Sequence, residues 1–137
     1  MMYDKKIALV IREDLQTWQK LNVAAFLASA VSIQFPDTHG KEFVNASGSL
    51  YLPFIKHPIL IYKAANDAEI RRAFIRAKER ELHIGIYTEP LFATKNEEEN
   101  HVEIAKHTDE DQVLVGIAIY GEIKKVNKAV DGLKFHA

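Results

Sequence analysis

The chain has 137 residues, of which 47% are hydrophobic and 27% charged, and its formal net charge is −1. This length predicts a single domain over residues 1–137, and the balanced charge gives no general indication of a nucleic-acid or acidic-membrane partner. The sequence has no cysteine, which excludes disulfides, thiolate metal sites and cysteine nucleophiles. Its first apolar run is too short for a signal peptide or a membrane span, so we expect a cytoplasmic protein without a membrane partner.

Four segments have the pattern of buried strands. In residues 6–12 both alternating sets of side chains are apolar, which is typical of central strands in layered α/β domains. Residues 57–64 and 112–120 share this character. Residues 82–89 form a shorter candidate, which Gly85 weakens.

Three helices alternate with these strands. The first is expected to bury a stripe of Val23, Phe26, Leu27, Ala30 and Val31. The second runs from Asp67, a good N-cap, to Glu81, and it is expected to bury Ile70, Ala73, Phe74 and Ala77. The third starts near Gly121 and stops near Gly132. The order of elements predicts a three-layer α/β/α sandwich with a mixed four- to five-stranded sheet.

The remaining segments are less regular. Within residues 42–52, the letters NASG indicate a turn between two short strands. The apolar residues 51–55 suit either burial in the core or a homodimer contact. Residues 90–111 form a long acidic stretch, and such stretches are often functional or mobile. Residues 133–137 add a short terminal strand.

The opening stretch KIALVIREDL…VAAFLASA resembles the archaeal and eukaryotic type of peptidyl-tRNA hydrolase. In that family a strand K-x-V-L-V-V-R-x-D-L leads to a Gly-Lys pair and a helix opening A-A-Q-x-x-H-A. Residues 59–89 resemble its second βαβ unit, and residues 111–136 its last strand, helix and terminal strand. Through WQKLNVAAFLASA and YTEPLFAT the chain also resembles a bacterial domain-of-unknown-function family two thousand with the same fold. The resemblance implies a peptidyl-tRNA-hydrolase-II-like fold and no specific activity.

The residues that carry the hydrolase chemistry are replaced in this chain. Asn22 stands where the hydrolase has its lysine, Phe26 replaces its glutamine, and Ser29 replaces its histidine. Glu89 roughly takes the place of the aspartate in the hydrolase segment D-A-G-R-T, and Thr94 matches its threonine only with a one-residue gap. The resemblance therefore extends to the scaffold more than to the hydrolysis of the tRNA ester.

A site is expected where the strands end, because ligands of open α/β sheets collect beyond the carboxyl ends of the strands. We predict that residues 12–22 and 88–94 share this rim. The predicted ligand-binding residues are Arg12, Asp14, Trp18, Gln19 and Thr94, and the predicted catalytic residues are Asn22, Glu89 and Lys20. A purely structural interpretation makes Asp14 the helix cap, packs Trp18 on the first turn and leaves Asn22 in solvent.

Two functions are compatible with this rim. The favoured hypothesis is binding of a small polar or acyl ligand, with or without a reaction. The alternative is a peptidyl-tRNA hydrolase with a rebuilt site, in which Asn22 donates to the oxyanion and Glu89 is the base. Lys20 or Arg12 would supply the positive charge. The missing lysine, glutamine and histidine favour the first hypothesis, and neither requires a cofactor.

Two further patterns have simpler explanations. The Glu–His pairs within residues 98–107 could face together as metal ligands, but a charged, solvated helix produces such pairs readily. Arg72, Arg76 and Arg80 repeat at intervals of four, a spacing that could follow a phosphate backbone. Interleaved glutamates and the lack of a basic excess favour a solvated helix. We therefore expect no metal and treat tRNA as the less favoured partner.

Overall fold

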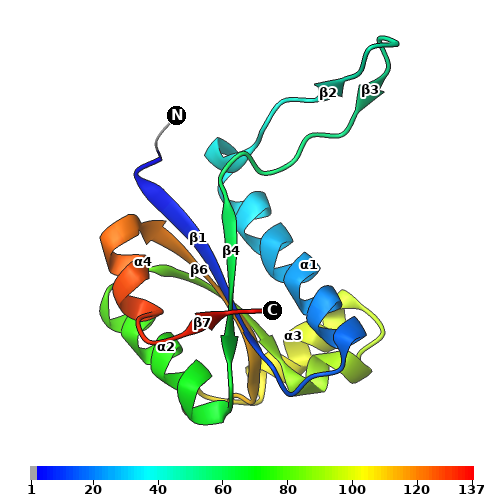
Figure 1. The fold of residues 1–137 in the computed structure, drawn as a ribbon. Coiled ribbons are helices and arrows are strands. Elements are labelled where there is room, and N and C mark those ends of the chain that lie inside the picture. The colour runs from blue at the N-terminus through cyan, green and yellow to red at the C-terminus, as the bar shows by residue number, and fades with distance from the viewer. Residues whose placement is uncertain (1–2) are drawn as a thin grey trace.

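The computed structural model describes residues 3–137 as a five-stranded sheet between helices (Figure 1). The sheet strands are β1 (Lys5–Arg12), β4 (Ile59–Ala64), β5 (His83–Thr88), β6 (Leu114–Glu122) and β7 (Lys134–Phe135). The helices are α1 (Thr17–Gln34), α2 (Asp67–Glu79), α3 (Glu97–Ala105) and α4 (Ile123–Ala129), with short 3-10 turns η1 (Pro36–Thr38) and η2 (Glu89–Ala93). No helix within residues 3–137 combines the length and apolar character needed to cross a membrane.

The strands lie in the order β5-β6-β1-β4-β7. β1 and β4 pair in parallel, whereas β6 is antiparallel to both β1 and β5, and β7 is antiparallel to β4. The prediction of an α/β fold with a mixed sheet is therefore confirmed. β4 and β5, which flank α2 in the chain, run in the same direction but lie three places apart in the sheet.

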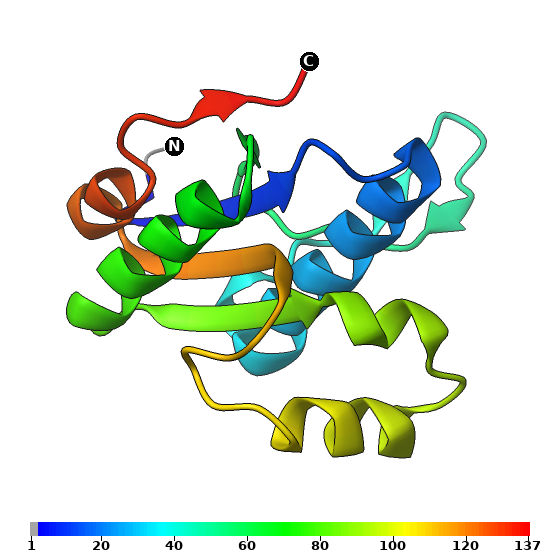
Figure 2. The ribbon, with the colours of Figure 1, turned by 90° about the horizontal axis from the view of Figure 1, so that it is seen from below.

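The helices cover both faces of the sheet, as Figure 2 shows. One core cluster joins the sheet to α2 and α4, and the other joins it to α1. The predicted stripe of α2 is buried throughout: Ile70, Ala73, Phe74 and Ala77. Three layers result because nearly every residue of β6 is buried, so both of its faces need a cover.

α1 differs from its predicted packing. Val23, Leu27 and Val31 are buried as expected, but Phe26 and Ala30 are exposed, so their assignment to the core is wrong. The close approach of α1 to the sheet depends on Gly116 of β6. A Cβ there would lie 2.5 Å from Val23 Cγ1, a distance at which one of the two must move.

Helix α2 begins one residue earlier than the predicted cap implies. Asn66, and not Asp67, is the N-cap: its side chain accepts a hydrogen bond from the backbone N–H of Glu69 at 3.0 Å. The predicted last helix, α4, ends at Ala129 with Val130 as its C-cap. Gly132, at φ +88°, adopts a left-handed conformation that favours glycine in the turn between α4 and β7.

The predicted hairpin forms and makes a sheet of its own. β2 (Phe43–Val44) and β3 (Leu50–Tyr51) are antiparallel around a turn that includes Gly48 at φ +80°. We call residues 41–54 the arm. In Figure 1 the arm projects from the end of the domain at which α1 finishes.

Candidate functional site

The predicted rim lies along the side of the sheet at which the parallel strands end, and this side is the edge meant below. Since β1, β4 and β5 run in the same direction, their carboxyl ends meet at this edge, and β6 begins there. The chain leaves β1 into α1 and leaves β5 into η2. A single strand, β6, separates the two exits, which is a short enough span for large side chains to meet across it.

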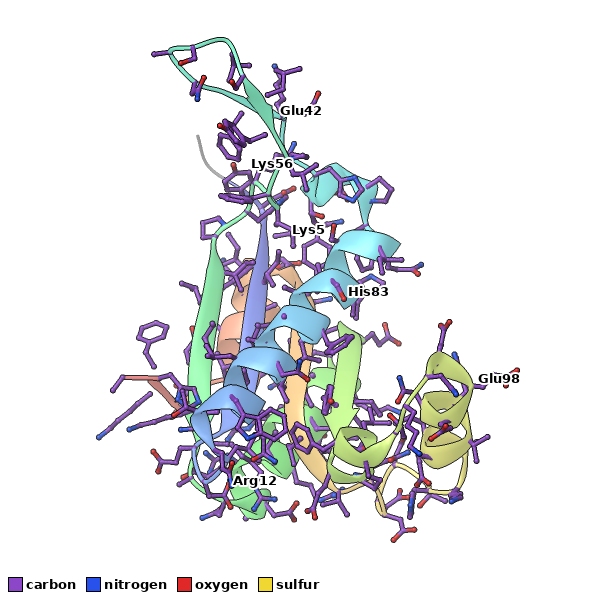
Figure 3. All side chains as sticks on the ribbon, turned by 90° about the vertical axis from the view of Figure 1, so that its right-hand side faces the viewer. Lys5, Arg12, Glu42, Lys56, His83 and Glu98 are labelled. Carbon is purple, nitrogen blue, oxygen red and sulfur yellow. The ribbon has the colours of Figure 1, made fainter. Side chains whose placement is uncertain are left out.

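Arg12 at the end of β1 is held by a bidentate ion pair. Its Nε and Nη2 donate to the two carboxylate oxygens of Asp14 at 3.1 and 2.7 Å. The hydrogen bond from Arg12 lowers the pKa of Asp14, and the pKa of Arg12 is raised by Asp14 first and also by the charges of Asp67 and Glu89. Three carboxylates therefore act on one guanidinium. Figure 3 shows Arg12 at this edge, near the start of α1.

Asp14 is not the cap of α1. The helix follows Gln16, whose backbone N–H donates to Gln19 Oε1 at 3.0 Å. The indole N–H of Trp18 donates to Gln16 Oε1 at 2.8 Å, which fixes the orientation of the ring. Gln19 thus closes the first turn of the helix. The interpretation of Asp14 as the helix cap is wrong, because its carboxylate is engaged by Arg12.

The two exits are joined by four aromatic rings, which we call the aromatic seam: Trp18, Phe26, Tyr87 and Phe92. Trp18 meets Phe92 edge-on with ring centroids 5.8 Å apart, Phe92 lies 5.1 Å from Tyr87, and Tyr87 lies 6.0 Å from Phe26. Burial raises the pKa of the Tyr87 hydroxyl. Trp18 and Phe26 are each 56% exposed, so the seam has an open side.

Asn22 lies in the middle of this seam along α1. It follows Trp18 by four residues and precedes Phe26 by four, so the three side chains share one stripe of the helix. Its side chain is exposed, whereas Lys20 is half-buried and contributes to the lowered pKa of Asp14. Glu89 is exposed at the start of η2. The predicted residues Lys20 and Asn22 of α1 and Glu89 of η2 thus lie around the same edge.

Thr94 lies apart from the α1 side. Its hydroxyl donates to the carbonyl of Leu91 at 2.9 Å and bonds to the side chain of Asn100 in α3. It lines a hollow of about 380 Å³ between η2 and α3, together with Asn96 and Glu99. The geometry connects Thr94 to α3 and to no residue of the first loop.

A second polar cluster, at the opposite edge, was not predicted. The hydroxyl of Tyr120 lies 3.5 Å from Asp37, and the ring of His57 packs edge-on against Tyr120. Burial raises the pKa of Tyr120 and lowers that of His57, whose Nδ1 has no hydrogen-bond partner within residues 3–137. These residues come from three distant segments, so no local sequence pattern indicates the cluster.

Members of the two secondary patterns make contacts within the chain. Arg76 donates to the carbonyl of Asp131 at 3.0 Å, and Arg80 donates to the carbonyl of Arg76 at 3.1 Å. In α3, His101 pairs with Glu97 at 3.5 Å. Within residues 3–137, no group of three or more histidine, aspartate or glutamate side chains is arranged to hold a metal ion.

Comparisons with known proteins agree with this fold. The chain is similar to a solved structure, that of the protein of unknown function Atu0240 from Agrobacterium tumefaciens strain C58. The match covers 99% of this chain and 100% of that one. The two share 33% sequence identity and a TM-score of 0.95. No protein with a curated description matches the chain. The family model for the protein of unknown function DUF2000 matches residues 5–137, and the chain therefore belongs to the DUF2000 family.

Proposed function

We propose that the rim binds a small molecule that has an acyl or other apolar part and a polar end. The observation that carries this proposal is the contact between Trp18 and Phe92, which joins the loop after β1 to the turn after β5. Partly exposed aromatic rings with an amide between them are typical of ligand sites, in which apolar walls bury the ligand and a few polar groups orient it. Asn22 offers both a donor and an acceptor.

The charges of the rim indicate which polar end is favoured. Arg12 is neutralised by Asp14, and the carboxylates of Asp67 and Glu89 also act on it. Lys20 is the second cation close to Asp14. Asp67 is itself paired with Arg71 at 3.6 Å. Asp14 and Glu89 therefore balance Arg12 and Lys20, and no excess positive charge remains to favour a phosphate or a carboxylate over a neutral or cationic group. An uncharged ester or amide, or an acyl group attached to a cation, fits this description.

A hydrolase with a rebuilt site is our second proposal. Supporting it, Glu89 lies close enough to Arg12 for its charge to raise the pKa of the guanidinium, so a base and a cation share the rim. The peptidyl-tRNA-hydrolase-like fold is part of this proposal and rests on the sequence resemblance. The lack of excess positive charge at the rim opposes it, because tRNA brings phosphates to the site.

Trp18 provides the test, since it is the single tryptophan of the chain. Its fluorescence should be titrated with butyrylcholine, with the methyl ester of N-acetylphenylalanine, and with butyrate as the anionic counterpart. We expect the two esters to shift or quench the emission and butyrate to do so much less. Phe92→Ala should abolish the response, whereas Phe135→Ala, at an exposed ring on β7, should retain it. A response that Phe92→Ala leaves unchanged would contradict the site.

Turnover of a peptidyl-tRNA substrate separates the two proposals. If the chain only binds a small ligand, no release of the peptide is expected, and Asn22→Ala weakens the fluorescence response. If the chain is a hydrolase, release is rapid in the wild type and lost in both Asn22→Ala and Glu89→Ala. That second result would replace the binding proposal.

A further inference from the structure

The arm exposes an unusual number of large apolar side chains. Those exposed are Phe43, Val44, Leu50, Tyr51, Leu52 and Phe54. Phe43 is paired with Tyr51, and Val44 with Leu50, so the two pairs alternate between the two faces of the hairpin. Leu52 is 82% exposed. Two strands of two residues cannot form a core of their own, so within residues 3–137 both faces of the arm lack a cover.

α1 has a second uncovered apolar surface on the side away from the sheet. We call Leu21, Ala25, Ser29 and Ile33 the outer face of α1, since they follow one another at intervals of four. All four are exposed, Ile33 to 79%. No residue from position 21 to position 36 is charged. A solvated helix normally has charges on such a face, and their depletion is characteristic of the centre of protein–protein interfaces.

The two surfaces lie on the same side of the molecule. In Figure 1 the arm leaves the domain beyond the last turn of α1 and leans toward the side that α1 covers. Figure 3 looks onto α1 from that side and shows Glu42 and Lys56 at the base of the arm, above the end of the helix. The arm extends beyond the end of α1 on this side. A molecule that packs on the outer face would therefore also contact the arm.

We propose that this molecule is a second copy of the chain, related by a two-fold axis. The two α1 helices cross antiparallel at Ala25 and Ser29, whose small side chains allow the helices to approach closely. Leu21 and Ile33, one turn to either side, then pack on the partner's helix. The arm of each copy lies against the partner beyond the first turn of its α1, because antiparallel helices bring the end of one beside the beginning of the other.

The area available matches what a stable dimer needs. The exposed side chains of the outer face and of one side of the arm together give a surface of the order of the about 800 Å² that each partner buries in interfaces of standard size. A two-fold contact uses the same surface on both copies, so one unpaired apolar surface is sufficient to build it. The net charge of −1 produces little repulsion between copies.

Cross-linking through one introduced cysteine tests the helix contact. The chain has no cysteine, so Ser29→Cys places a single thiol near the proposed axis, and a short bismaleimide should convert the protein to covalent dimer. Ile75→Cys, at a half-exposed position on α2, is the matched control and should remain monomeric on the denaturing gel. Equal cross-linking of both variants, or of neither, overturns the antiparallel α1 contact.

Light scattering tests the contribution of the arm. We expect the wild type to be a dimer and the double variant Leu52→Asp/Phe54→Asp to be a monomer with an unchanged circular dichroism spectrum. Ile75→Asp should stay dimeric. A wild-type monomer at millimolar concentration, or a dimer that the arm variant leaves intact, overturns the proposal. Both tests use the protein without a rim ligand, so a failed rim proposal and a failed dimer proposal can be distinguished.

Discussion

Helices α1 and α2 cover opposite faces of one sheet, and their solvent-facing sides differ in composition. The outward side of α2 is rich in charged residues, and several of them are bonded within the chain. Arg71 donates to the backbone carbonyls of Asp109 and Gln112, and Lys78 pairs with Asp109. The outward side of α1 is apolar and uncharged from Leu21 onward.

This difference indicates which side of the molecule meets other molecules. The charges of α2 satisfy its face in water, so its packing on the sheet completes its structural role. α1 packs on the sheet equally well and still leaves apolar surface exposed, next to the aromatic seam at one end and the arm at the other. Surfaces of this kind mark interaction sites.

The largest expected effect on stability distinguishes the buried side of α1 from its outer face. Leu27→Ala removes a buried side chain and should lower the free energy of unfolding by about 3 kcal/mol. Ile33→Ala, at an exposed position of the same helix, should change it by less than about 0.5 kcal/mol in the monomer. Urea unfolding at low protein concentration measures both. Equal losses would mean that the outer face is packed within the single chain.

The close approach of α1 to β6 provides a second test. Gly116→Ala adds a Cβ at 2.5 Å from Val23 and 3.1 Å from Leu27, and we expect a loss of about 1–3 kcal/mol from overpacking. Gly85→Ala on β5 is the control, because its Cβ would lie 3.4 Å from Ala30, close to an ordinary contact. Thermal unfolding should rank the two variants in this order. A reversed order would contradict the described packing of α1.

The sequence was informative where one residue pattern determines one structure. The buried stripe of α2 follows from its spacing, and the strand alternation indicates the covered sheet. The outward exposure of Phe26 could not be read in this way, because α1 is apolar on every side and its spacing favours no single face. Only the position of the neighbouring strand β5, which is fixed by distant pairing, places Phe26 beside Tyr87.

The candidate site was predictable to a similar extent. The rim was expected because strands β1 and β5 end there, and the structure brings Trp18 of one loop to Phe92 of the other. The capping role of Gln19 and the Arg12–Asp14 pair depend on local geometry that several side chains could have satisfied. Thr94 turns toward α3, whose position follows from tertiary contacts and not from a motif.

The polar cluster at the opposite edge should make stability depend on pH. Burial is the main cause that lowers the pKa of His57. The charges of Lys56 and Lys5 also lower this pKa, and those of Asp37 and Asp4 oppose the shift. The unfolded chain therefore binds the proton more readily than the folded chain. The free energy of unfolding has its full value above the ordinary histidine pKa of about 6.5 and decreases as the pH falls below it. We expect His57→Phe, which keeps a ring beside Tyr120, to flatten the stability profile between neutral pH and pH 5.

Chemical unfolding at a series of pH values measures this dependence. His83→Phe is the matched control, because His83 is exposed and contacts the same Tyr120 ring. It should retain the wild-type profile. A profile that His57→Phe leaves unchanged would mean that His57 titrates alike in the folded and unfolded chain.

The smallest expected effect concerns the ion pair of the rim. Arg12 lowers the pKa of Asp14, so the pair stabilises the fold above the ordinary aspartate pKa and loses this contribution as the pH falls through the lowered value. Because the Asp14 side chain is 52% exposed, solvent screening limits the contribution to less than about 1 kcal/mol. Asp14→Asn should therefore be slightly less stable than the wild type at pH 7 and equal to it in strong acid. Glu13→Gln, which breaks the longer 3.4 Å pair with Lys63, should have a smaller effect at pH 7. If Asp14→Asn is the more stable protein at neutral pH, Arg12 and Asp14 are held together at a cost in stability, which would point to a role of this pair in binding.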